Sequence, residues 1–90
     1  MFFRRQASGE RIVAVAVQLD EFVLSLPAPA RHEDLYAGVH RATGALPTPD
    51  QQGFLTSKGR FVKRHAARDI AIAAGQADRD CLLLTSQHLW

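Results

Sequence analysis

The residues whose types and spacing most clearly suggest a binding site are five cations that lie close together in the second half of the chain. Between positions 58 and 68 the sequence has five Lys or Arg residues and no Asp or Glu, although the whole chain carries a formal charge of only +2. The rest of the chain therefore carries −3, so the positive charge is a local feature. A local cluster suits a compact anionic ligand better than a duplex nucleic acid, which is contacted over many phosphates. The five cations are Lys58, Arg60, Lys63, Arg64 and Arg68.

The segment around these cations offers further groups that bind phosphate. A turn over residues 56–59 (TSKG) would present hydroxyl and backbone N–H groups beside a helix start. The guanidinium groups of Arg60 and Arg64 form planar forks that suit phosphate oxygens. The segment is not a Walker A loop, because five residues separate Gly53 from Gly59 where that motif has four, and no Lys-Ser or Lys-Thr pair follows. A solvated basic surface is the alternative interpretation.

A second group of candidates comes earlier, in the stretch PARHEDLYAGVH. Arg31 and His32 stand at an expected helix start, where they could join an anion site. His32, Tyr36 and His40 recur every four residues along one helical face, but HExxH is absent and no Cys or carboxylate completes a zinc set. Tyr36, or Phe61 from the later segment, could stack on a base. The predicted ligand-binding residues are Arg31, His32, Tyr36, Thr56, Ser57, Lys58, Arg60, Phe61 and Arg64.

No set of side chains indicates catalysis. The serines lack the strand–turn–helix setting of a nucleophile elbow, and Cys81 has no His and no positive helix end near it in the sequence. His65 and Asp69 have the i, i+4 spacing that is typical of a local ion pair. A single cysteine excludes an intramolecular disulfide and suits the reducing cytoplasm, where we expect this thiol to be buried. The sequence therefore predicts a cytoplasmic protein that is not an enzyme, with no catalytic residue, no metal and no cofactor.

The hydrophobic pattern predicts a small α+β domain in which two helices pack on a mostly antiparallel sheet. The first strand is apolar on both alternating faces, so we expect it to be central and covered. Two inward stripes are predicted on the helices, one formed by residues 35, 39 and 42 and the other by residues 66, 67, 70, 71 and 74. The expected order is strands at 12–19 and 22–26, a helix at 31–44, strands at 54–57 and 60–62, a helix at 64–74 and a strand at 82–85.

Residues 1–10 are predicted to be a flexible N-terminal arm, and residues 11–90 a single α+β domain. The apolar run of residues 12–19 meets Asp20 and Glu21 instead of a small-residue cleavage site, so we do not expect a signal peptide. No stretch is long enough to span a bilayer. A chain of 90 residues buries only a modest core, which favours a homo-oligomer.

Three segments of the sequence resemble a known protein family. ARHEDLY, QGFLTSKGRFVKRHAARDIAIAAGQ and LLLTSQHLW, in that order, resemble a family of small phage and prophage proteins. The family pattern has Gly-Phe-Leu-x-x-x-Gly-Arg-Phe-Val, an Ala-rich helix that ends Ala-Gly-Gln, and a terminal Ser-x-x-Leu-Trp; the resemblance covers residues 12–90. This chain departs from it at Glu33, where a second His is common, at Lys63 and His65, and at 87–88, where Gln-His replaces Glu-Asp.

Part of this family is similar to phage sponge proteins that counter Thoeris-type defence, which are oligomers that sequester cyclic nucleotide signals without cleaving them. The resemblance implies a phage or prophage accessory protein that sequesters a phosphorylated, nucleotide-type immune signal and forms a homo-oligomer. The alternative is a protein-interaction module that inhibits a host defence complex through its basic face. Nucleic-acid binding is less favoured, an enzyme is the least favoured interpretation, and no membrane partner is expected.

Overall fold

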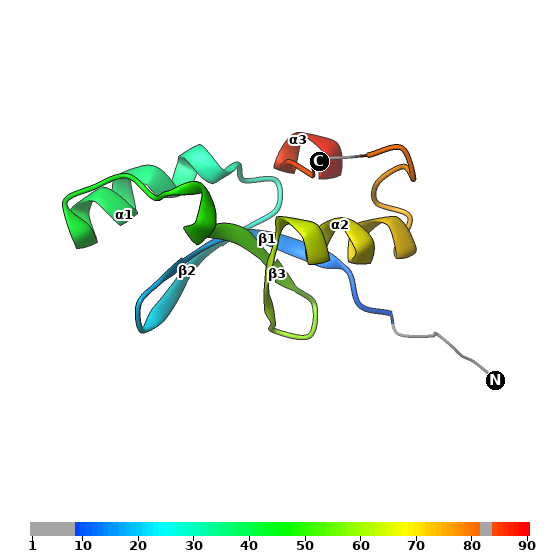
Figure 1. The fold of residues 1–90 in the computed structure, drawn as a ribbon, viewed down its shortest axis with the longest axis horizontal. Coiled ribbons are helices and arrows are strands. Elements are labelled where there is room, and N and C mark those ends of the chain that lie inside the picture. Colours follow the sequence, from blue (N-terminus) through cyan, green and yellow to red (C-terminus); the bar gives the residue numbers. More distant parts are fainter. Residues whose placement is uncertain (1–8, 82–83) are drawn as a thin grey trace.

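The computed structural model describes residues 9–81 and 84–90, and in this part of the chain it shows four strands in one antiparallel sheet with helices on one side (Figure 1). The strand order is β2-β1-β3-β4. The predicted α+β class, with two helices of eight or more residues on an antiparallel sheet, is confirmed. The elements are β1 (Ile12–Leu19), β2 (Phe22–Pro27), η1 (His32–Leu35), α1 (Tyr36–Thr43), η2 (Pro49–Gln51), β3 (Gln52–Thr56), β4 (Phe61–Lys63), α2 (Arg64–Ala73) and α3 (Ser86–Leu89).

The central strand β1 pairs with β2 on one side and with β3 on the other. Val15 lies opposite Leu26 of β2 and Phe54 of β3, and both Val15 and Phe54 are fully buried. Side chains alternate between the two faces of a strand, so this row of residues points to the helices and forms the middle of the core. The register between β1 and β3 shifts once, between Ile12 and Ala14.

The strand β1 is central, as predicted, and most of its residues are buried on both faces. Among the described residues the helices nevertheless cover only one face of the sheet (Figure 1). Ala14 and Ala16, which point to the other face, are only 4% and 0% exposed. Short alanine side chains are covered by their larger neighbours on the sheet itself, so burial of these positions does not require a second layer.

The segment predicted as one helix at 31–44 begins as the 3-10 turn η1 and continues as α1. The backbone N–H of Arg31 donates to Asp34 Oδ2 at 2.8 Å, which satisfies one of the free donors at the start. Gly44 ends α1 with a φ of 81°, the left-handed cap that glycine adopts without strain. Leu35 and Val39 are buried as predicted, whereas Ala42 is exposed because it follows the turn of the helix away from the sheet.

The alanine-rich helix α2 also buries a narrower stripe than predicted. Ala67 and Ala71, one turn apart, are 0% exposed and lie against the sheet. Ile70 is half-buried, and the wider stripe is wrong at Ala66 and Ala74, which are exposed. A helix that rests on two alanines approaches the sheet closely, and the residues on either side of that line then turn towards solvent.

The C-terminal segment packs over the helices instead of adding a strand to the described sheet. Leu82 and Leu83 of the predicted strand at 82–85 lie outside the described residues, and Leu84 and Thr85 are not in a strand. Leu84 is nevertheless fully buried, and Cys81 is buried and free as expected. Trp90 packs against the core and donates from Nε1 to the Ala30 carbonyl at 2.8 Å. None of the described helices is long and apolar enough to cross a membrane.

Candidate functional site

The predicted ligand-binding residues occupy three places in the structure. Thr56, Ser57, Lys58 and Arg60 form the β3–β4 turn at one end of the sheet. His32, Tyr36 and Arg64 line a hollow on the helix-covered side, with Arg31 next to it. Phe61 lies on the opposite face, where its ring covers Gly53 so closely that a Cβ added there would stand 2.6 Å from the ring. The structure therefore divides the nine residues into four in the turn, three in the hollow with Arg31 beside them, and Phe61, which is on the wrong face to stack on a ligand held in the hollow.

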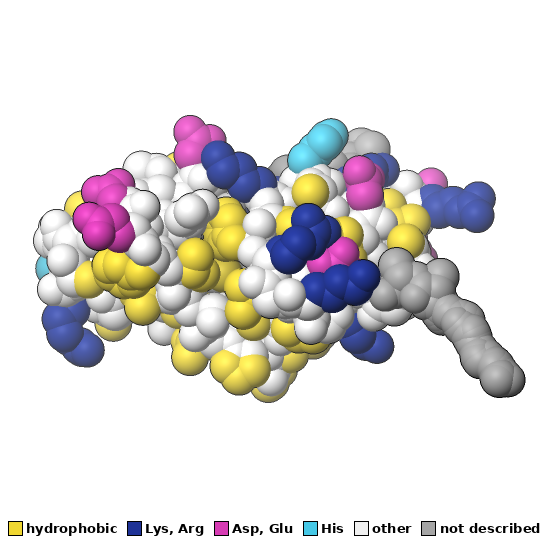
Figure 2. Space-filling model, turned by 90° about the horizontal axis from the view of Figure 1, so that it is seen from below, with side chains coloured by type: hydrophobic (Ala, Val, Ile, Leu, Met, Phe, Trp, Pro, Cys, Tyr) yellow, Lys and Arg dark blue, Asp and Glu magenta, His cyan; other side chains and the backbone are white. Residues whose placement is uncertain are grey.

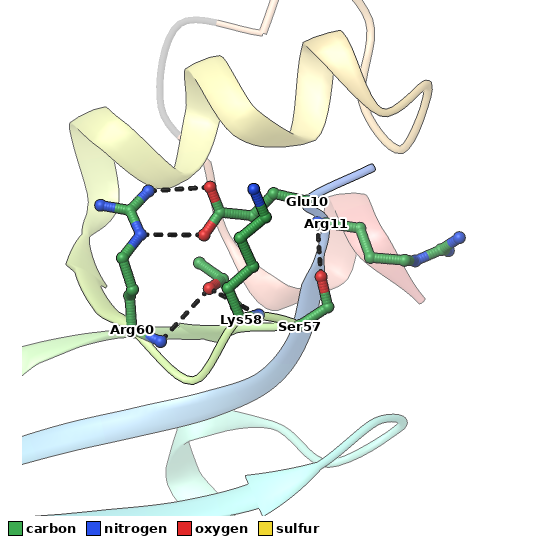
Figure 3. Close-up of polar contacts among 6 residues, drawn as sticks. Glu10, Arg11, Ser57, Lys58 and Arg60 are labelled. Carbon is green, nitrogen blue, oxygen red and sulfur yellow. Dashed lines mark hydrogen bonds and ion pairs between the residues drawn. The ribbon is translucent and has the colours of Figure 1, made fainter. Parts of the chain in front are cut away.

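The polar groups of the β3–β4 turn are used within the turn (Figure 3). The Thr56 hydroxyl accepts from the backbone N–H groups of Lys58 and Arg60, at 3.2 and 3.3 Å. Ser57 Oγ accepts from the backbone N–H of Arg11 at 3.1 Å, which fastens the turn to the start of β1. The hydroxyls that suggested a phosphate cradle therefore serve first to hold the turn closed.

Arg60 has a counter-charge that the sequence analysis missed. Its Nε and Nη2 donate to the two carboxylate oxygens of Glu10 at 2.9 and 2.8 Å, a bidentate pair (Figure 3). The bonds from Arg60 and the Thr56 hydroxyl lower the pKa of Glu10 to about 2, with smaller help from the charge of Lys58. Glu10 falls within residues 1–10, which we expected to be an arm, and fifty residues separate it from Arg60, so no local pattern could reveal the pair.

The hollow lined by His32, Tyr36 and Arg64 adjoins a second one along α2, and we name the two together the α2 groove. The first has a volume of about 240 Å³ and the second about 310 Å³. Gln52 and Arg64 line both hollows, so Arg64 lies at their junction. The charged residues of the groove are Lys63, Arg64, Arg68, Asp50 and Glu33, a balance of +1 without the histidines.

Arg64 is a cation of the α2 groove that has an unpaired hydrogen-bond donor among the described residues. It is the first residue of α2, and its Nε is fully buried without a hydrogen-bond partner among the described residues. A buried donor of this kind costs about 1–3 kcal/mol when it stays unpaired. The preceding residue, Lys63, provides no side-chain cap for α2, so the first N–H groups of the helix also lack that partner. An anion at this point would meet the guanidinium and the positive end of the helix together.

His32 contributes a neutral ring to the α2 groove. Its exposed fraction is 8%, and Nε2 lies 2.7 Å from the Gly53 carbonyl, which can only accept, so Nε2 carries the proton. Burial lowers the pKa of His32, and the nearby charge of Arg64 lowers it further, against the opposing effects of the Gly53 bond and of Glu33. The ring packs edge-on against Phe54 at 4.9 Å between centroids. At neutral pH His32 therefore offers the lone pair of Nδ1, not a positive charge.

The two remaining arginines near the groove are occupied with the C-terminal segment. Arg31 donates from Nη1 to the Ser86 carbonyl at 2.6 Å, and Arg68 donates from Nε to the Cys81 carbonyl. Arg68 also pairs with its neighbour Asp69 at 3.2 Å, so the predicted His65 pair is replaced by a contact with the adjacent residue. These bonds position the groove wall formed by the last residues, so the side-chain donors of Arg31 and Arg68 are partly used within the fold.

The histidine spacing that raised the question of zinc does not place His32 and His40 in one environment. His32 is buried and His40 is exposed, although both lie on the same segment. Among residues 9–81 and 84–90, no group of three or more His, Cys, Asp or Glu side chains could hold a metal ion.

Comparison with protein families gives a match over most of the chain. The model of the phage T4 y16D protein family matches residues 11–90, which include all four strands and the whole α2 groove. No curated protein sequence and no solved structure gives a significant match. Since the family model spans nearly the entire chain, and since the sequence itself resembles small phage proteins over the same residues, the chain belongs to the phage T4 y16D family.

Proposed function

We propose that this phage-family protein binds a phosphorylated small molecule of nucleotide type in the α2 groove and sequesters it unchanged. The observation that carries the proposal is Arg64, which lines both hollows and keeps a buried Nε without a partner among the described residues. A phosphate oxygen is the natural acceptor for such a group, because a planar guanidinium binds phosphate through paired hydrogen bonds. The uncapped start of α2 adds its positive end at the same place.

The dimensions and the other lining residues support a nucleotide rather than a simple inorganic ion. The hollows of about 310 and 240 Å³ adjoin, and small-molecule sites in proteins commonly measure about 300–1,000 Å³. Tyr36 is half-buried and offers an aromatic ring at the far end from α2. Gln52 and the neutral ring of His32 add groups that could accept or donate hydrogen bonds to a base or a sugar. A sponge needs binding alone, so the proposal assigns no residue a catalytic role.

The β3–β4 turn supports a second candidate, a surface that docks on a host protein. Lys58 is exposed at the tip of the turn, and the Arg60 side chain is 57% exposed even while it is paired with Glu10. The turn lies at one end of the sheet and none of its residues lines the α2 groove. Its hydroxyls are hydrogen-bonded within the fold, whereas its cations remain exposed. An acidic partner surface would bind there through Lys58, and Arg64→Ala would leave that binding intact.

The test combines native mass spectrometry with titration calorimetry. We expect native spectra of the purified protein to show a bound small molecule, and denaturation to release it intact with a mass that contains phosphate. The ligand-free protein is then titrated with ADP-ribose, cyclic ADP-ribose and a set of cyclic dinucleotides. Arg64→Ala should weaken binding by about 1.5–3 kcal/mol, which is a rise in Kd of roughly tenfold to more than a hundredfold.

Arg41→Ala is the matched control, because Arg41 is an exposed arginine in the last turn of α1 and its loss changes the net charge equally. It should bind as the wild type does. Equal affinity of the Arg64→Ala variant and the wild type would refute the α2 groove as the site. A ligand-free protein that binds none of the named nucleotides would refute the sponge, and a steep loss of affinity for DNA or RNA with salt would indicate a nucleic-acid protein instead.

A further inference from the structure

The face of the sheet that turns away from the helices is largely apolar. Strand alternation and the pairing register place its members: Ala14 and Ala16 on β1, Val23 on β2, Leu55 on β3 and Phe61 on β4 are its apolar residues. We name these five residues the uncovered sheet face. Figure 2 views the molecule from the side away from α1 and α3. Hydrophobic side chains gather across the middle and lower part of that view, between an acidic group at the left and a group of two basic side chains and one acidic side chain right of the centre.

The uncovered sheet face is shaped for close packing. Its centre consists of two alanines that are only 4% and 0% exposed, and beside them the ring of Phe61 covers Gly53, so a partner would contact mainly Val23 and the half-buried side chains of Leu55 and Phe61. Val23 is 36% exposed, among the most exposed large hydrophobic residues in the described chain. The polar residues Gln18 and Ser25 share this side, are exposed and flank the apolar strip, and the exposed Lys63, at the end of β4, stands between this side and the α2 groove that it also lines. An apolar centre with a polar rim is the usual anatomy of a protein–protein interface.

Opposite charges stand at the two ends of this face. The β1–β2 turn carries Asp20 and Glu21, both exposed. The other end carries Lys58, because the pairing of Ile12 with Thr56 brings the β3–β4 turn beside the start of β1. Arg11 is exposed at the same end, while the charge of Arg60 is taken up by Glu10. Two net negative charges therefore face two net positive charges along the direction of β1.

We propose that the uncovered sheet face is the interface with a second copy of this chain, packed face to face with the strands of the two copies running in opposite directions. A two-fold axis that lies between the sheets and across the strands places the acidic turn of each copy over the basic end of the other. The same face turned the other way would set like charges against each other, which disfavours that arrangement. The self-complementary charge pattern is the reason to assign a second copy instead of an unrelated partner.

The first test is the oligomeric state of the full chain, measured by sedimentation equilibrium over a concentration series. We expect a dimer in the wild type and a monomer in the Val23→Lys variant, because a lysine at that position would bury its charge against apolar side chains. Leu46→Lys is the matched control, since Leu46 is 61% exposed and lies after α1, away from the uncovered sheet face. It should remain a dimer. A monomeric wild type, or equal effects of the two substitutions, would overturn the proposal.

The second test reverses charges and does not depend on how well Val23→Lys folds. Asp20→Lys with Glu21→Lys should weaken the dimer by about tenfold or more, and Arg11→Glu with Lys58→Glu should do the same, since like charges then meet. The four changes together should restore the wild-type affinity, because the pattern is inverted but again complementary. A dimer affinity that neither charge reversal changes would contradict the proposal. A dimer formed through the edge of β2 would behave in that way. The assay needs no nucleotide, so its outcome is independent of the α2 groove.

Discussion

Gln76 joins the end of α2 to the start of β1 through two hydrogen bonds, and its removal should cost a measurable part of the stability. The backbone N–H of Ile12 donates to Gln76 Oε1, and Gln76 Nε2 donates to the Ile12 carbonyl, both at 2.8 Å. The amide thus pairs with one residue of β1 as a neighbouring strand would, close to the shift in register that follows Ile12. A hydrogen bond contributes about 0.5–1.5 kcal/mol net, and an unsatisfied buried group costs about 1–3 kcal/mol.

Gln76→Ala would leave the N–H and the carbonyl of Ile12 unpaired, and both bonds are partly buried. We therefore expect the free energy of unfolding to fall by about 2–4 kcal/mol, the lower part of the range for two unsatisfied groups. Gln76→Glu should cost at least as much, because a carboxylate has no donor for the Ile12 carbonyl and would place two oxygens together. The chain has one tryptophan, Trp90, which packs against the core. Its fluorescence during urea unfolding reports the stability of each variant.

Gln18→Ala is the control, because Gln18 is an exposed glutamine on β1, the strand to which Gln76 is hydrogen-bonded. We expect a change of about 0.5 kcal/mol or less for it, as for most exposed sites. All variants are compared at one protein concentration, since association would make stability depend on concentration. If Gln76→Ala and Gln18→Ala lie within 0.5 kcal/mol of each other, roughly the spread of neutral surface changes, the argument that Gln76 completes the pairing of β1 is refuted.

Three further predictions concern single positions. Gly53→Ala should destabilise the fold by about 2 kcal/mol or more in urea unfolding, since the new Cβ would lie 2.4 Å from the Val62 carbonyl oxygen, and an unchanged midpoint would contradict this. Glu10→Gln should remove a stability contribution that is present above pH 4.5 and is lost as the pH falls towards 2, because pairing lowers the pKa of Glu10 in the folded state; equal acid melts of the variant and the wild type would refute it. Burial lowers the pKa of His32, so its contribution is present above pH 6.5 and declines below it, and a proton NMR titration that finds a pKa of 6.5 or higher would be inconsistent with the structure.

Much of the fold follows from local sequence. The β1 range, Ile12–Leu19, agrees with the prediction, and the glycines at 44, 59 and 75 have the positive φ values of 81°, 79° and 76° that turns and helix ends favour. These features depend on residues that are close in the sequence, so the local sequence pattern is enough to predict them. The width of the inward stripes was overestimated, since apolar residues alone do not reveal how closely a helix rests on its sheet.

The candidate site was less accessible to prediction because it depends on strand alternation and on contacts between distant segments. Phe61 and Arg64 are three residues apart, yet they serve opposite faces of the sheet, since β4 ends and α2 begins between them. Gln52 lines both hollows together with Arg64. In the sequence, nothing near Gln52 except its position beside a strand pointed to a role in a site. The register that aligns Gly53 with Ala16 and Lys63 is set by the pairing of three strands. It could not be predicted from the sequence of any one of them.

The five cations of residues 58–68 show why composition alone could not separate a binding site from a solvated surface. Arg60 is paired with Glu10, and Arg68 is engaged by the Cys81 carbonyl and Asp69, so the fold itself supplies their partners. Lys58 is exposed at a turn, where a lysine needs no partner. Arg64 differs from these three because one of its donors is buried and unpaired among the described residues. Lys63 is exposed as well, at the end of β4. The sequence shows five like charges, whereas the fold shows which of them have partners, so Arg64 is the first residue to test in a ligand search.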